Sequence, residues 1–66
     1  MFRIEKFKAA LVENGLTVAD AAAAMGISKQ ALYRKMNGES DFYREEIQAF
    51  RKLINRDNVD DIFFAE

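Results

Sequence analysis

The stretch TVADAAAAMGISKQALYRKMNG, Thr17 to Gly38, decides the fold of this chain. It predicts two short helices separated by a glycine turn. Thr17 and Ser28 are good N-caps, because their hydroxyl oxygens can accept a hydrogen bond from a free backbone N–H at a helix start. Gly26 and Gly38 can take the positive φ that often ends a helix. We therefore expect one helix that stops at Gly26 and a second from Ser28 to Asn37.

The side chains of this stretch divide between a buried face and an exposed face. In the first helix the apolar side chains recur at helical spacing and share one side. In the second helix we expect Ile27, Leu32 and Met36 to point inward. Lys35 should lay its stem along the core and keep its ammonium group in solvent. The outward face then carries polar, basic and aromatic side chains, namely Lys29, Gln30, Tyr33, Arg34 and Asn37.

This pattern resembles the helix-turn-helix of the phage Cro and CI repressors, the XRE-like family. Ala22 stands where that family keeps a small residue, so that the two helices can approach closely. Gly26 stands at the turn glycine, Ile27 at the apolar residue after it, and Leu32 at the core position of the recognition helix. Val18 departs from the pattern, because the family usually has a phosphate-contacting Gln at that position. The resemblance implies a lambda-repressor-like fold and binding to double-stranded operator DNA.

If the resemblance holds, the helix from Ser28 enters the major groove with its N-terminal residues near the base edges. Gln30 suits bidentate pairing with adenine, and Lys29 or Arg34 suits guanine or a phosphate. Each of these residues alone would be an ordinary surface side chain. Their position on one common face is what favours DNA.

Three further residues are candidates for contacts along the DNA. Tyr33 offers its ring to a thymine methyl group and its hydroxyl to a phosphate. Asn37, at the far end of the helix, is expected to meet the backbone. Thr17 and the N–H groups after it can hold a phosphate at a helix start. Together with the base-reading residues and Ser28 at the start of the helix, they make up the predicted DNA-binding face.

The distribution of charge leaves a second function class open. The chain carries a formal net charge of −1, and its isoelectric point is near 5.4, whereas most nucleic-acid-binding domains are basic. This balance favours a protein-interaction module, such as an anti-repressor or an adaptor. The segment from Gly26 to Gly38 nevertheless holds three basic residues and no acidic one. The segment after Arg56 is acidic and holds no basic residue. This segregation favours DNA as the partner.

The rest of the chain predicts three more helices. The first covers Phe2–Asn14. Another covers Arg44–Asn55, where Tyr43 is the N-cap and Glu46 can accept its backbone N–H. A last short helix covers Val59–Phe64. With 66 residues and no proline, the chain predicts a single all-α domain over residues 1–66, a compact bundle of about five short helices.

The composition excludes several kinds of chemistry. Cysteine and histidine are absent, which removes disulfides, thiolate chemistry and the usual zinc sites. The neighbouring carboxylates Asp60 and Asp61 would point about 100° apart on a helix. We expect no enzyme, no cofactor, no metal and no small-molecule substrate. No apolar run approaches the roughly 20 residues that span a bilayer, and no signal peptide is evident. A cytoplasmic protein of a bacterial cell, without membrane contact, is expected.

The C-terminal end suggests how two copies would pair. Asp57 or Asn58 should cap the last helix. One recognition helix reads only a few base pairs, so a homodimer is expected on DNA, with half-sites about 34–36 Å apart. Phe64 and Ile62 are the candidates for the dimer interface. In the alternative arrangement, Ile62 and Phe63 fold back onto the monomer core and leave only Phe64 exposed.

Overall fold

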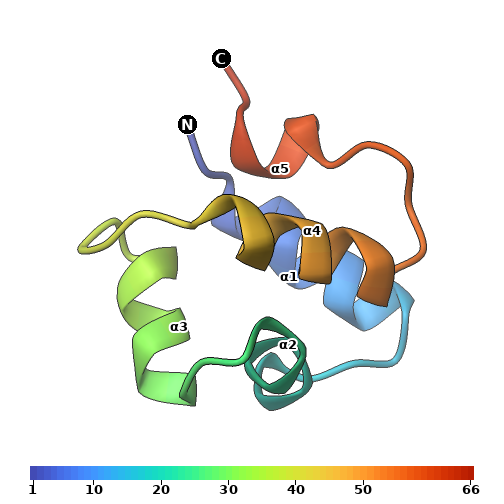
Figure 1. Cartoon of the computed structure of the whole chain (residues 1–66). Coiled ribbons are helices and arrows are strands. Elements are labelled where there is room, and N and C mark those ends of the chain that lie inside the picture. The colour runs from blue at the N-terminus through green and yellow to red at the C-terminus, as the bar shows by residue number, and fades with distance from the viewer.

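The computed structural model describes residues 1–66 as five helices without a strand, which confirms the all-α fold class. Figure 1 shows α4 across the middle of the molecule, with α2 and α3 on one side and α5 on the other. The helices are α1 (Ile4–Glu13), α2 (Val18–Met25), α3 (Lys29–Met36), α4 (Arg44–Leu53) and α5 (Asp60–Phe63).

The turn between α2 and α3 follows the sequence prediction. Thr17 caps α2, and its Oγ1 accepts from the N–H of Asp20 at 3.2 Å. Gly26 ends the helix in the left-handed region, with φ of 74° and ψ of 28°. Ser28 then caps α3, because its Oγ accepts from the N–H of Ala31 at 3.0 Å. Two short helices are thus joined by a tight turn whose conformation depends on glycine.

The two chain ends lie side by side, which no sequence pattern predicted (Figure 1). The N–H of Arg3 donates to the carbonyl of Ile62 at 2.7 Å, and the N–H of Ala65 donates to the carbonyl of Met1 at 3.1 Å. Because Arg3 is extended, with φ of −110° and ψ of 99°, α1 begins at Ile4 rather than at Phe2.

The ends of the last two helices also differ from the prediction in detail. The α4 helix stops at Leu53, because Asn55 takes a φ of 53° and the N–H of Arg56 closes the end by donating to the carbonyl of Arg51 at 3.1 Å. The N-cap of α5 is Val59, without a side-chain cap, so the prediction of Asp57 or Asn58 as the cap was wrong. Asn58 still supports the helix start, because its Oδ1 accepts from the N–H of Asp60 at 2.7 Å.

The core is a cluster of phenylalanine rings supplemented by small side chains of α2. Phe7 of α1 stacks on Phe50 of α4 with ring centroids 4.5 Å apart. Phe63 meets Phe50 edge-on at 5.7 Å and Phe42 at 5.0 Å. These contacts join α1, α4 and α5, while Ala21, Ala22 and Met25 bring α2 against the same core. None of the five helices combines the length and the apolar character needed to cross a membrane.

Candidate nucleic-acid interface

The α3 helix is held to the molecule by one narrow face. Leu32 is fully buried, and Met36 is buried at the C-terminal end of the helix. Ile27, in the turn, is partly buried against the same core. On the facing helix, Ala22 is buried with 3% of its surface exposed, so only a small side chain separates α2 from its neighbours. Apart from Lys35, which is also buried, most of the remaining side chains of α3 face solvent.

The outward face of α3 carries all five side chains that the sequence placed there. None of them makes a side-chain hydrogen bond or an ion pair within the chain, so every one of their polar groups is available to a ligand. Tyr33 is 41% exposed, and no acidic residue lies within the helix. The exposed residues are Lys29, Gln30, Tyr33, Arg34 and Asn37.

The start of α2 is less suited to an anion than the sequence suggested. Thr17 is exposed, as expected, but its own N–H donates to Oδ2 of Asp20 at 2.8 Å. The hydroxyl of Thr17 already accepts the N–H of Asp20, one of the groups expected to hold a phosphate, and the negative charge of the Asp20 carboxylate opposes an anion at this helix start. The spacing from Thr17 to Asp20 is that of a capping box, a local signal that predicts this arrangement. Val18, the next residue, is partly buried against the core.

The prediction for Lys35 was wrong. Its side chain is only 7% exposed, and its ammonium group lies inside the molecule rather than in solvent. Nζ lies 3.1 Å from Oε1 of Glu46, donates to the carbonyl of Asp41 at 2.8 Å, and lies 4.4 Å from the centroid of the Tyr43 ring. The three partners compensate the charge that is removed from water.

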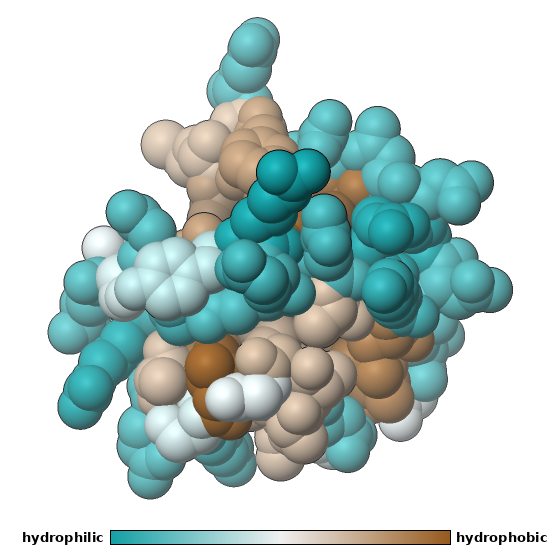
Figure 2. All heavy atoms as spheres, viewed as in Figure 1, coloured by the Kyte–Doolittle hydropathy of each residue, from teal (hydrophilic) through white to brown (hydrophobic).

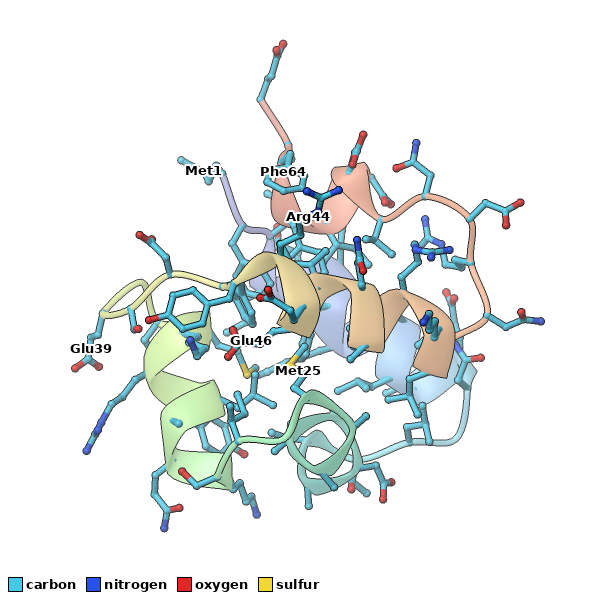
Figure 3. The ribbon with its side chains drawn as sticks, viewed as in Figure 1. Met1, Met25, Glu39, Arg44, Glu46 and Phe64 are labelled. Atoms are coloured by element: carbon cyan, nitrogen blue, oxygen red, sulfur yellow. The ribbon has the colours of Figure 1, made fainter.

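Glu46 completes this arrangement from the other helix. Its Oε1 also accepts the backbone N–H of Tyr43 at 2.8 Å, which confirms the predicted cap of α4. Figure 3 shows Glu46 at the start of α4, directed toward α3. One carboxylate therefore caps α4 and pairs with Lys35 of α3. The pair fixes the C-terminal end of α3 relative to α4 and so contributes to the direction in which the exposed face points.

The C-terminal residues separate into core and surface. Ile62 is fully buried, so the prediction that it lines a dimer interface was wrong for the folded monomer, because the side chain packs inside the phenylalanine cluster. Phe63 is buried as well, with 6% exposed, in agreement with the alternative arrangement. Phe64 is 59% exposed and remains available. No group of three or more metal-ligating side chains occurs in the structure.

Comparison of the chain with protein-family models, with curated proteins and with solved structures finds no significant match. A functional assignment therefore depends on the geometry and chemistry of the residues themselves.

Proposed function

We propose that this protein is a sequence-specific double-stranded DNA-binding regulator of transcription. The α2 helix, the Gly26 turn and α3 act as a helix-turn-helix, and α3 enters the major groove with Lys29 and Gln30 leading. A regulator of this kind, comparable to a Cro-like repressor, would act on operator DNA in the cytoplasm of a bacterial cell. No catalytic step and no cofactor is part of the proposal.

The observation that carries the proposal is the set of exposed polar side chains that share one face of α3. Lys29, Gln30, Arg34 and Asn37 are exposed there and have no hydrogen-bond or ion-pair partner within the chain. They lie on a helix whose first turn contains no acid and whose opposite face is buried. The amide of Gln30 can make two hydrogen bonds to adenine, and a guanidinium such as that of Arg34 can make two to guanine.

The phosphate contacts available from α2 are fewer than the resemblance implied. Val18 offers no polar group, and Asp20 places a negative charge at the helix start. Lys29 and Arg34 are then the principal cations near the DNA. We expect binding that decreases with salt, with a slope of about −0.9 for each phosphate contacted. The slope should be shallow compared with that of a strongly basic domain.

A protein-interaction module remains the second candidate. The negative charge of Asp20 at the start of α2 favours it, because this charge repels DNA phosphates. With a net charge of −1 and a carboxylate at the start of α2, the surface as a whole attracts DNA weakly. In this alternative the free polar groups of α3 bind an acidic surface of another protein.

A titration of labelled DNA separates the two candidates. The probe is a duplex from the region upstream of the protein's own gene, measured at two salt concentrations against a scrambled duplex. We expect preferential binding to the upstream duplex that weakens at the higher salt concentration. Equal, weak binding of both duplexes would contradict the proposal and favour the protein-interaction module.

The same assay tests the role of Gln30. Gln30→Ala should lower affinity for the preferred duplex by about 1–3 kcal/mol and relax the preference at one base pair. Gln48, which is exposed on α4, provides the matched control, because Gln48→Ala removes the same group away from α3. An unchanged sequence preference in Gln30→Ala would show that the reading face is assigned to the wrong residues.

A further inference from the structure

A hollow of about 620 Å³ lies between α4 and the start of α5, and polar residues form most of its lining. On the α4 side it is lined by Arg44, Gln48 and Arg51, which share one helix face because they are four and three residues apart. Figure 2 shows strongly hydrophilic atoms of α4 directly beside apolar atoms around α5 and the chain ends. The volume is within the range of about 300–1,000 Å³ that is usual for small-ligand sites.

The opposite side of this α4–α5 hollow is acidic. Asp57 and Asp60 line it there, and neither carboxylate accepts a hydrogen bond or joins an ion pair within the chain. Just outside the hollow, by contrast, Arg56 and Asp61 pair at 3.0 Å. The charges inside the hollow thus stand on two separate sides, basic on α4 and acidic near α5, without neutralising each other.

A small apolar surface separates the two charged sides. Phe64 provides most of it, because its ring lines the hollow and the residue is 59% exposed. Phe42 and Ile47 are partly buried and add to it, whereas Val59 is buried and contributes little. In Figure 3, Arg44 lies close to Phe64, so the basic side and the apolar surface adjoin.

We propose that the α4–α5 hollow binds a short peptide of two or three residues with both ends free. Its carboxylate pairs with Arg44 and Arg51, and its ammonium group pairs with Asp57 and Asp60. A guanidinium group suits this role, because it can donate two parallel hydrogen bonds to one carboxylate. An apolar side chain of the peptide covers the ring of Phe64.

The charge of the lining favours a neutral ligand with two charged ends. Two arginines and two aspartates sum to zero, so a purely anionic ligand is opposed by the acidic side and a cationic one by the basic side. The ends of an extended peptide of two or three residues lie about 7–10 Å apart, which suits separated partners better than a free amino acid does. The amide of Gln48 can both donate to and accept from the peptide bond.

This inference is independent of the proposed DNA binding. No residue of α3 lines the α4–α5 hollow, so a peptide bound there leaves the exposed face of α3 uncovered. A protein that failed to bind DNA could still bind the peptide, and the reverse also holds.

The first test is a titration of the 15N-labelled protein with three tripeptides, alanyl-valyl-alanine, alanyl-leucyl-alanine and alanyl-phenylalanyl-alanine. At least one should bind with a dissociation constant of about 0.1–1 mM. The largest amide shift changes should fall within residues 44–51 and 57–60. Acetylating the amino end or amidating the carboxyl end of the best peptide should each raise the dissociation constant about fivefold or more. Both modifications are made on the ligand, so the wild-type protein is used throughout.

The second test assigns each end of the peptide to its side of the hollow. Arg44→Gln should weaken binding of the free peptide and reduce the loss caused by amidation, but not the loss caused by acetylation. Asp60→Asn should do the opposite. Arg34→Gln on α3 and Glu45→Gln on α4 are the matched controls, because both residues are exposed and neither lines the hollow. Thermal melting of each variant checks that it is folded.

Four results would overturn the proposal. The first is that none of the three peptides binds with a dissociation constant below about 10 mM, a value weaker than any specific site of this size should give. The second is that only one terminal modification weakens binding, which would indicate the terminus of a larger protein as the ligand. The third is that free leucine binds as tightly as the best peptide. The fourth is that the folded Arg44→Gln and Asp60→Asn variants bind the peptide as their controls do.

Discussion

At the scale of single residues, Gly26 imposes the clearest constraint on the chain. Its φ of 74° lies in the left-handed region, yet a Cβ added there would meet no atom within 4 Å. A side chain at this position is therefore opposed by backbone strain and not by a clash. The conformation allows Ile27 to donate its N–H to the carbonyl of Ala22 at 3.0 Å and directs the chain into α3.

Gly26→Val should lower the free energy of unfolding by about 1–2 kcal/mol, because a β-branched residue is strained at this φ. Urea unfolding followed by circular dichroism measures the change. Gly26→Asn is the matched control, because asparagine tolerates the left-handed region better than valine does. Its free energy of unfolding should fall by less than that of Gly26→Val. If Gly26→Val were as stable as wild type, the turn would not depend on glycine and its placement would be incorrect.

Residue-scale features could be predicted where the signal is local. The N-caps Thr17 and Ser28 and the turn at Gly26 follow from the chemistry of a few adjacent residues. Asn55 also carries a local signal, because asparagine tolerates the left-handed φ of 53° that follows the end of a helix. The prediction placed Asn55 inside the helix because the apolar pattern of α4 continues to Ile54. The burial of Ile62 beside the exposed Phe64 depends on how α5 packs on α1, which the local pattern leaves open.

At the scale of elements, the buried pair of Lys35 and Glu46 links α3 to α4. Both side chains are less than one-tenth exposed, and no buried polar side-chain atom in the structure lacks a partner. Removing one member of such a pair leaves the other charge uncompensated, whereas removing both can be much less costly. The pair therefore constrains the orientation of α3 more than it adds to the total stability.

Lys35→Met should destabilise the protein by about 3–5 kcal/mol, because the carboxylate of Glu46 stays buried without its cation. The double variant Lys35→Met/Glu46→Leu should recover part of this loss. Arg56→Met is the control, since the Arg56–Asp61 pair is 40% and 45% exposed. It should cost about 1 kcal/mol or less. Chemical denaturation measures all three, and equal losses for Lys35→Met and Arg56→Met would contradict this account of the pair.

The positions of the helices could be predicted to within a few residues, but the contacts between them could not. A lysine on a polar helix predicts a solvated ammonium group, and nothing near Lys35 in the sequence indicates Glu46 as its partner. Likewise, the pairing of Arg3 with Ile62 joins opposite ends of the chain. Contacts of this kind depend on the packing of the whole bundle.

At the scale of the whole molecule, the phenylalanine cluster and the exposed face of α3 have separate roles. Five of the six rings pack together and unite α1, α4 and α5 with the two ends of the chain, whereas Phe64 stays outside. The α3 helix contributes few side chains to this core and keeps its polar face free. The fold class could be predicted from helical periodicity, because a small all-α core needs only that pattern. The ligand of α3 remains a proposal.

The most direct test of the central claim is an amide chemical-shift titration of the 15N-labelled protein with a duplex selected from a random double-stranded library. We expect the largest changes between residues 28 and 37, with Lys29, Gln30 and Arg34 among them. The exposed side of α1, which carries Lys6 and Lys8, should change little. A failure of the library to yield any preferred duplex, or largest changes on α1, would contradict the claim that the exposed face of α3 binds DNA.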